Sequence, residues 1–219
     1  IENIFDDISF KVSPKDDYRS SYRFRFIKSF YKIFKKEKNY VFDNCIINKE
    51  KIDLDLRKEL IKIDSMSTYA IGYLINRICK NLSKNQVYLN IGCWKGFSLV
   101  AGMINTECKV IGVDNFSQFT GPKNDFIKNF ENSKKSNHFF FEQDYEKYFE
   151  SLDHTKDKFD FYFYDGEHSY DNQFKNLEIA DNFLNVGSLV LIDDINFDEV
   201  YEGTLDFINK TKSKFRIIK

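Results

Sequence analysis

The chain has 219 residues, 42% of them hydrophobic and 31% charged, which is enough for one sizeable core and within the range of a single domain. Its 33 basic and 34 acidic side chains nearly cancel, so no global field favours nucleic acid as a partner. The sequence also lacks any apolar run of the roughly 18 residues that a membrane span requires.

The cysteine pattern indicates the compartment. The four cysteines form no C-x-x-C pair and lie among apolar residues, at Cys45, Cys79, Cys93 and Cys108. Reduced thiols of this kind are typical of cytosolic chains, whereas small secreted domains use cysteines as a disulfide framework. No signal peptide opens the sequence. We therefore expect a soluble, cytoplasmic protein.

Residues 1–60 are irregular in pattern and contain a stretch in which aromatic and basic side chains interleave, YRSSYRFRFIKSFYKIFKKEK. Within it, apolar side chains recur at helical spacing, at Phe26, Phe30, Ile33 and Phe34, which predicts an amphipathic helix. We expect residues 1–60 to form an N-terminal helical extension and residues 61–219 to form one domain. The extension either packs on the domain, as a lid or a dimer contact, or binds an anionic partner or a membrane surface.

From residue 65 onward, helical patterns alternate with short apolar runs. Strands are predicted at 87–91, 109–114, 138–142, 159–165 and 188–193, and helices at 65–82, 97–106, 123–132, 145–152 and 171–184. A further helix is expected at 198–210 and a sixth strand at 214–218. Such alternation predicts right-handed βαβ units and a doubly wound, mainly parallel sheet in a three-layer α/β/α sandwich.

The stretch LNIGCWKGFSL marks the end of the first of these strands. A dinucleotide-binding turn would read G-x-G-x-x-G, but counting from Gly92 the second and third glycine positions hold Trp94 and Phe97, which leaves little room for a pyrophosphate. The remaining pattern, with Gly92 and Gly96 permitting a bend and close approach, suits a ligand without a pyrophosphate, such as S-adenosylmethionine. The alternative is a strand-to-helix turn whose glycines serve geometry alone.

Acidic residues follow the next two strands. Asp114 lies 22 positions beyond Gly92, where a carboxylate can accept hydrogen bonds from ribose hydroxyls. Asp144 follows the third strand and could accept from the amine of an adenine, although a solvated loop carboxylate is the alternative. Together with the glycine turn, these residues place three ligand-binding signals at three successive strand ends.

At these residues the sequence resembles the class I S-adenosylmethionine-dependent methyltransferases, and within them a macrocin O-methyltransferase-like group. The motifs that carry the resemblance are LNIGCWKGFS, GVDNFS and FDFYFYDGEHSYDNQFKNLEIADNFLNVGSLVLIDDI, and it covers about residues 65–195. The resemblance implies a Rossmann-like methyltransferase fold. The last strand of that fold has no counterpart after residues 214–218.

The resemblance also implies roles for individual residues. Gly92, Gly96 and Ser98 would line the methionine part of the cofactor, Asp114 would hold the ribose and Asp144 the adenine. Asn90 stands where the family usually has an acidic residue, and its amide can still accept a hydrogen bond from the cofactor.

Three carboxylates and a histidine carry the predicted chemistry. The resemblance suggests that Asp165, Asp193 and Asp194 bind a divalent metal, usually Mg²⁺, and that His168 is the general base. A hard cation would relieve the repulsion between carboxylates at the ends of neighbouring strands, and it would promote loss of a proton from an acceptor hydroxyl. Alternatively, Asp193 and Asp194 cap the following helix and Asp165 faces the cofactor, while His168 caps a helix or packs beside Tyr170.

The sequence therefore predicts an S-adenosylmethionine-dependent O-methyltransferase, assisted by Mg²⁺, that acts on a hydroxylated small molecule such as a sugar or a glycosylated metabolite. His168 and Asp165 are its predicted catalytic residues. No nucleic-acid partner is expected, and the chain could form a homo-oligomer. The alternatives are a nicotinamide-dependent oxidoreductase and a non-catalytic module with a decayed cofactor site.

Overall fold

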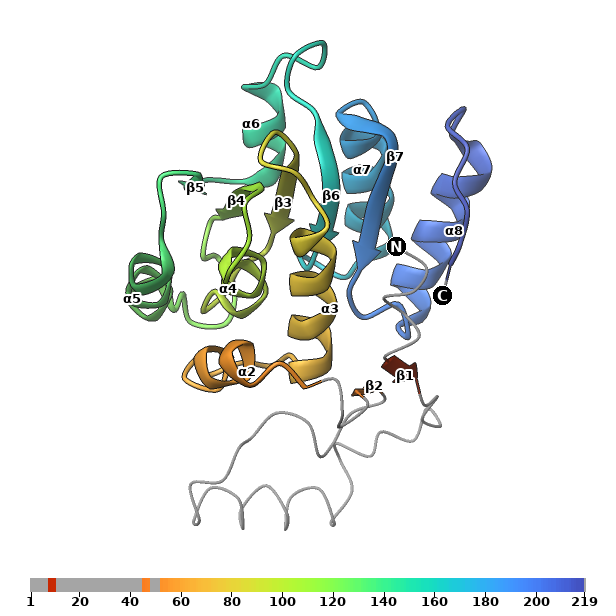
Figure 1. Ribbon diagram of the computed structural model, residues 1–219. Helices are drawn as coiled ribbons and strands as arrows, with labels where there is room; N and C mark the ends of the chain where they lie inside the picture. The colour runs from red at the N-terminus through yellow and green to blue at the C-terminus, as the bar shows by residue number, and fades with distance from the viewer. Residues whose placement is uncertain (1–7, 11–44, 48–51, 219) are drawn as a thin grey trace.

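A computed structural model describes residues 8–10, 45–47 and 52–218. Its centre is a sheet of five parallel strands in the order β5-β4-β3-β6-β7, seen in Figure 1. The strands are β3 (Val87–Ile91), β4 (Lys109–Asp114), β5 (His138–Glu142), β6 (Phe159–Tyr164) and β7 (Leu184–Ile192). From β3 the chain adds β4 and β5 on one side, then crosses to add β6 and β7 on the other. The strand order therefore reverses between β3 and β6.

Helices cover both faces of the sheet. They are α2 (Leu54–Leu60), α3 (Tyr69–Lys80), α4 (Phe97–Met103), α5 (Lys123–Ser133), α6 (Tyr145–Glu150), α7 (Tyr170–Asp181) and α8 (Asp198–Lys210). None of the helices in the described part of the chain is long and apolar enough to cross a membrane. The predicted three-layer α/β/α sandwich with a doubly wound parallel sheet is confirmed.

Alternation along the strands divides the interior into two cores. On one face of the sheet, Tyr88 of β3 and Phe161 of β6 pack with residues of α2, α3, α4 and α5. Their chain neighbours Leu89 and Tyr162 point to the other face and pack with α6, α7 and α8. Because side chains alternate across a strand, a run such as FDFYFY supplies both cores at once.

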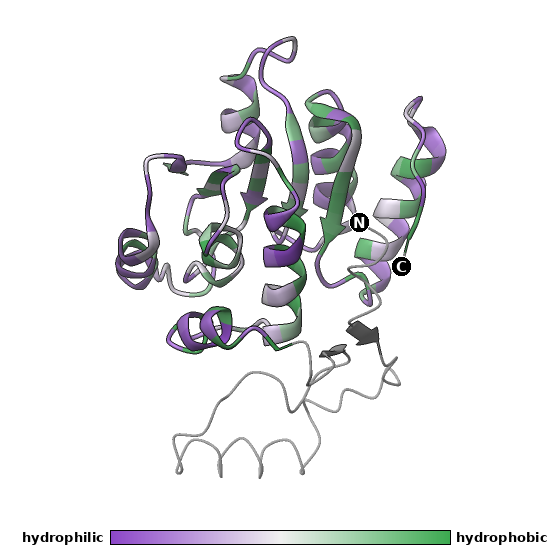
Figure 2. Cartoon of the chain, viewed as in Figure 1, coloured by the Kyte–Doolittle hydropathy of each residue, from purple (hydrophilic) through white to green (hydrophobic). Residues whose placement is uncertain are grey.

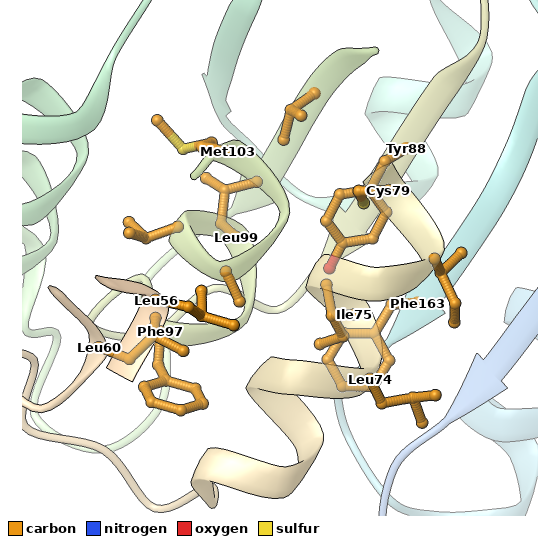
Figure 3. Close-up of a cluster of buried hydrophobic side chains, with 14 of the residues drawn as sticks. Leu56, Leu60, Leu74, Ile75, Cys79, Tyr88, Phe97, Leu99, Met103 and Phe163 are labelled. Atoms are coloured by element: carbon orange, nitrogen blue, oxygen red, sulfur yellow. The ribbon is translucent and has the colours of Figure 1, made fainter. Parts of the chain in front are cut away.

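Figure 3 shows part of the first core, with labelled side chains from α2, α3 and α4 gathered near Tyr88 and Phe163. Figure 2 shows β7 coloured largely as hydrophobic and α5 largely as hydrophilic. The helix α5 therefore presents only a narrow apolar stripe to the core, with Phe126 and Phe130 buried one turn apart.

Short polar side chains begin the main helices. Thr68 accepts a hydrogen bond from the backbone N–H of Ile71 at the start of α3, and Ser169 accepts one from Asn172 at the start of α7. These bonds satisfy amide groups that have no partner within the helix. The two helices, predicted to begin near residues 65 and 171, begin at residues 69 and 170 in the structure.

The N-terminal part of the chain is described only in pieces. Residues Ile8–Phe10 (β1) and Cys45–Ile47 (β2) form an antiparallel pair outside the main sheet. The predicted amphipathic helix around residues 26–34 lies outside the described residues. The predicted division into an extension at 1–60 and a domain at 61–219 stays a prediction.

The prediction of a sixth strand at 214–218 is wrong, because these residues form no strand. Phe215 packs instead against Phe207 of α8, with ring centroids 5.5 Å apart, and the segment returns along α8 in Figure 1. Strand β7 also begins four residues earlier than predicted. An irregularity in its pairing with β6 separates Leu184 from Leu189, and Gly187 with φ +84° lies within it.

Candidate active site

The candidate site lies at the carboxyl ends of β3 and β6, where the strand order reverses. Crevices at this position are the usual ligand sites of open parallel sheets. Here the backbones of the two strand ends approach closely, and a Cβ atom added to Gly92 would lie 1.9 Å from the carbonyl oxygen of Asp165. Only glycine fits at this position. The approach brings the glycine turn after β3 next to the DGEH segment after β6.

The glycine turn is a tight loop with several residues in the left-handed region. Gly92, Trp94 and Gly96 have φ values of +79°, +45° and +93°. Trp94 adopts this conformation although it has a Cβ atom, which costs about 1–2 kcal/mol. Its indole Nε1 is buried and has no hydrogen-bond partner among the described residues. The surrounding contacts must therefore hold the turn in this shape.

Asp114, the predicted ribose-binding residue, is one of the groups that hold the glycine turn in shape. The carboxylate at the end of β4 reaches across to the turn and accepts hydrogen bonds from the backbone N–H groups of Cys93 (2.7 Å) and Trp94 (2.8 Å). Its other oxygen accepts a hydrogen bond from the backbone N–H of Phe116 at 2.6 Å. A carboxylate offers about four lone-pair sites, so these three hydrogen bonds leave room for one from a ribose hydroxyl. Ribose binding by Asp114 stays a prediction.

Asn90 and Ser98, both predicted to contact the cofactor, lie beneath the turn and are almost fully buried. The Ser98 hydroxyl donates to Asn90 Oδ1 at 2.8 Å, and Asn90 Nδ2 donates to the carbonyl oxygen of Gly92 at 3.0 Å. The two side chains thus link the start of α4 to the first glycine. The amide donor explains why an asparagine suits this position, because a carboxylate could not donate to that carbonyl.

Asp144, the predicted adenine-binding residue, begins α6. One of its oxygens accepts a hydrogen bond from the Glu146 N–H at 2.9 Å, and the other accepts from Asn115 Nδ2 at 3.3 Å. Asn115 follows Asp114 in sequence, so the ends of β4 and β5 meet at the same rim. The structure therefore brings Asp144 close to Asp114, as the proposed nucleoside site requires, while its contact with adenine stays a prediction.

The predicted catalytic histidine lies between two predicted metal ligands. His168 Nε2 is 3.8 Å from Asp165 Oδ1, and His168 Nδ1 is 3.8 Å from Asp194 Oδ2. Its ring lies 6.1 Å from that of Phe197. The capping alternatives do not match this arrangement, since Ser169 is the residue that caps α7 and α8 begins after Phe197, whose side chain cannot accept a hydrogen bond.

Carboxylates crowd this end of the sheet. The pKa of Asp165 is raised well above its usual value, first by burial and then by the charges of Asp193, Asp194 and Asp114. Because 31% of the Asp165 side chain stays exposed, water moderates the effect of burial, and the neighbouring carboxylates remain a major cause of the raised pKa. An excess of negative charge at this crevice favours a cationic ligand.

Asp165, Asp193 and Asp194 are also the predicted metal ligands. Within the described ranges, no three histidine, cysteine, aspartate or glutamate side chains are grouped so that they could hold one metal ion. Asp165, Asp193 and Asp194 do interact, as the raised pKa of Asp165 shows. In this arrangement, however, they do not form a ready set of metal ligands.

Two residues at the site, Lys95 and Asn129, were not predicted from the sequence. Lys95, within the glycine turn, forms ion pairs with Asp64 and Asp125, and its carbonyl oxygen accepts a hydrogen bond from Asn129. Their partners lie 30 or more positions away in the chain, and no local motif connects them. Only the presence of a lysine between the two glycines could have drawn attention to this position.

Comparison with known proteins relates part of the chain to a protein family. Residues 89–195 match a family model described as a methyltransferase domain. The match covers 107 of the 219 residues, from β3 to just beyond β7. This match and the shared fold support the predicted class of enzyme, a methyltransferase, over the oxidoreductase. None of the curated proteins compared with the chain matches it.

Solved structures share the fold at low sequence identity. A proposed O-methyltransferase from Klebsiella pneumoniae is 17% identical, with a TM-score of 0.55 over 72% of this chain and 77% of that one. An O-methyltransferase from Bacillus cereus in complex with S-adenosylhomocysteine is 13% identical, with a TM-score of 0.53 over 84% of each chain. The O-methyltransferase TomG from Streptomyces achromogenes, in complex with S-adenosylmethionine, is 15% identical, with a TM-score of 0.51 over 73% and 78%.

Proposed function

We propose that this protein transfers a methyl group from S-adenosylmethionine to a hydroxyl group of a small molecule. The observation that carries the proposal is the negative crevice at the end of β3 and β6, where the charges of Asp193, Asp194 and Asp114 help to raise the pKa of Asp165. A sulfonium cofactor is cationic and relieves this repulsion, whereas the diphosphate of a nicotinamide cofactor would increase it. The methyltransferase domain and the fold that it shares with O-methyltransferases support the same assignment.

The chain's own residues would hold the cofactor along the rim already described. The backbone of Gly92 and Gly96 provides the close surface for the methionine part, Asp114 faces the ribose and Asp144 the adenine. Asn90 and Ser98 act from beneath, because their polar groups are occupied by each other and by the turn. Their contribution is therefore to hold the turn in shape.

His168 is the group proposed to take the proton of the acceptor hydroxyl. When bound, the cofactor supplies an electrophilic methyl group whose carbon–sulfur bond breaks as the new carbon–oxygen bond forms. The hydroxyl proton passes to His168, and the carboxylates of Asp165 and Asp194 on either side stabilise the imidazolium that results. Distances of 3.8 Å are long for hydrogen bonds, but catalytic contacts often tighten only when substrate is bound.

Magnesium assistance remains a separate prediction, and no step of the proposal depends on it. The three aspartates interact but do not form a ready ligand set. Calorimetry of the S-adenosylhomocysteine complex with MgCl₂ tests the prediction directly. Heat of binding that disappears in the Asp193→Ala and Asp194→Ala variants would support a metal site, and heat that persists in them would reject it.

Titration of the purified protein tests the main proposal. We expect S-adenosylmethionine and S-adenosylhomocysteine to bind and NAD⁺ not to bind. Because only the first ligand carries the sulfonium charge, Asp165→Asn should reduce any preference for it over S-adenosylhomocysteine. Binding of NAD⁺ alone would overturn the proposal in favour of an oxidoreductase, and binding of none of the three would favour a non-catalytic module.

The acceptor and the setting are proposed more broadly. The resemblance to macrocin O-methyltransferases suggests a sugar or a glycosylated metabolite as the acceptor, and a screen of hydroxylated compounds for release of S-adenosylhomocysteine would test it. Reduced cysteines agree with a cytoplasmic location, since Cys79, Cys93 and Cys108 are buried and unpaired as disulfides.

A further inference from the structure

Lys95 occupies a position in the glycine turn that the proposed chemistry does not use. Its ammonium lies 2.9 Å from Asp64 Oδ2 and 3.3 Å from Asp125 Oδ2, and 4.8 Å from the centre of the Trp94 ring. Only 18% of the side chain is exposed, whereas its two carboxylate partners are 56% and 61% exposed. The ammonium therefore lies beside the turn, between partners on two separate segments.

The two segments are far apart in the sequence. Asp64 lies between α2 and α3, and Asp125 lies in the first turn of α5. The ammonium between them joins the glycine turn to both. The pKa of Lys95 is raised chiefly by its bond with Asp64, so the lysine stays charged throughout the physiological range.

The helix α5 makes two further contacts with the turn. Asn129, one helical turn after Asp125, donates from Nδ2 to the carbonyl oxygen of Lys95 at 2.9 Å. Between them, the ring of Phe126 lies beneath Gly96, where an added Cβ would be 3.3 Å from Cδ2. Residues at this spacing lie on one face of a helix, and this face of α5 supports the turn through charge, hydrogen bond and packing.

We propose that Lys95 is a positioning residue for the cofactor. The turn contains Trp94 in the left-handed region, a conformation that persists only where surrounding contacts determine it. Asp114 holds the turn from the side of β4, and Lys95 holds it from the side of α5 and the segment before α3. A turn already held in its binding shape loses less entropy when the cofactor binds. The inference rests on the proposed use of S-adenosylmethionine.

Calorimetry with S-adenosylhomocysteine tests the role of Lys95. Lys95→Met removes the charge and keeps much of the length, and we expect the Kd to rise about tenfold, which corresponds to ~1.4 kcal/mol. Lys95→Arg should restore most of the affinity, because it keeps the charge between the two carboxylates. In steady-state assays, Lys95→Met should raise the KM for S-adenosylmethionine and leave kcat close to the wild-type value.

Lys134→Met is the matched control. Lys134 also pairs with a carboxylate, Glu131 at 3.1 Å, and also lies over an aromatic ring, that of Phe130 at 5.3 Å. Both contacts are at the far end of α5 from the turn. This variant should bind S-adenosylhomocysteine as the wild type does, although it loses contacts of the same kinds.

A second variant keeps the test decisive if Lys95→Met does not fold. Asp64→Asn combined with Asp125→Asn changes two exposed side chains and leaves the lysine without its anions, so affinity should fall in the same direction. Wild-type affinity in Lys95→Met or in this double variant would overturn the positioning role. Failure of the wild type itself to bind S-adenosylhomocysteine would instead overturn the proposed function, and the inference with it.

Discussion

Replacing Gly92 with alanine should separate the two demands on this glycine, its backbone conformation and the space beside it. With φ at +79°, any residue with a Cβ atom carries a strain of about 1–2 kcal/mol. The new Cβ would also lie 1.9 Å from the Asp165 carbonyl oxygen and 2.5 Å from the carbonyl carbon. Both are backbone atoms at the end of a buried strand, so they cannot move aside as a flexible side chain could.

The expected cost of Gly92→Ala follows from adding these effects. Forcing additional atoms into a packed site typically costs about 1–3 kcal/mol, so the total loss in free energy of unfolding should be about 2–5 kcal/mol with the strain included. Urea denaturation measures it as a lower midpoint at an unchanged slope. Binding of S-adenosylhomocysteine should weaken as well, because β3 and β6 must separate at the cofactor crevice.

Gly187→Ala is the control for strain alone. Gly187 has a similar φ of +84°, but an added Cβ would meet no atom within 4 Å. It should therefore cost only about 1–2 kcal/mol and leave ligand affinity unchanged. Equal losses of stability in the two variants would refute the close approach of the β3 and β6 ends on which the site depends.

Three further predictions concern polar groups that are buried or half-buried. Burial lowers the pKa of His138 to about 4. As the pH falls, the imidazole is therefore protonated in the unfolded state before it is protonated in the folded state. Roughly 2–3 kcal/mol of the free energy of unfolding should be lost between pH 6.5 and pH 4. Urea denaturation at several pH values should show a smaller loss in His138→Gln. Asp160→Ala removes the acceptor of the Val87 N–H at the start of β3 and should lower the free energy of unfolding by about 1–3 kcal/mol, whereas an unchanged midpoint would contradict this. Asn90→Asp removes the donor to the Gly92 carbonyl oxygen and should lower the melting temperature, although it introduces the acidic residue that the methyltransferases usually have at this position. A higher melting temperature would contradict the structural role of this amide.

Most of the fold could be predicted because its signals are local. Short apolar runs predict β3, β4 and β5 at their observed bounds, and β6 to within one residue. The first four residues of β7, 184–187, were not predicted, because the pairing of this strand with β6 is irregular around Gly187. The segment at 214–218 has the composition of a strand, but the packing of Phe215 against Phe207 outweighs that propensity.

The candidate site could be predicted only in part, for a related reason. Glycines and acidic residues at strand ends are visible in sequence, and the parallel sheet brings those ends together. Which groups then contact each other depends on side chains from distant elements. Nothing in the sequence around Asp114 indicates that its carboxylate accepts from the amides of Cys93 and Trp94.

These contacts change how the acidic residues of the site are understood. The sequence predicts that a carboxylate at a strand end is a ligand for the cofactor, but Asp114 also holds the turn that the cofactor would contact. Removing it would therefore weaken binding in two ways, through a lost acceptor and through a loosened turn. Lys95 offers the means to separate them, because its side chain supports the same turn through other elements and offers no acceptor to the ribose. If Lys95→Met and Asp114→Asn weaken binding to a similar extent, the shape of the turn outweighs the hydrogen bonds to ribose.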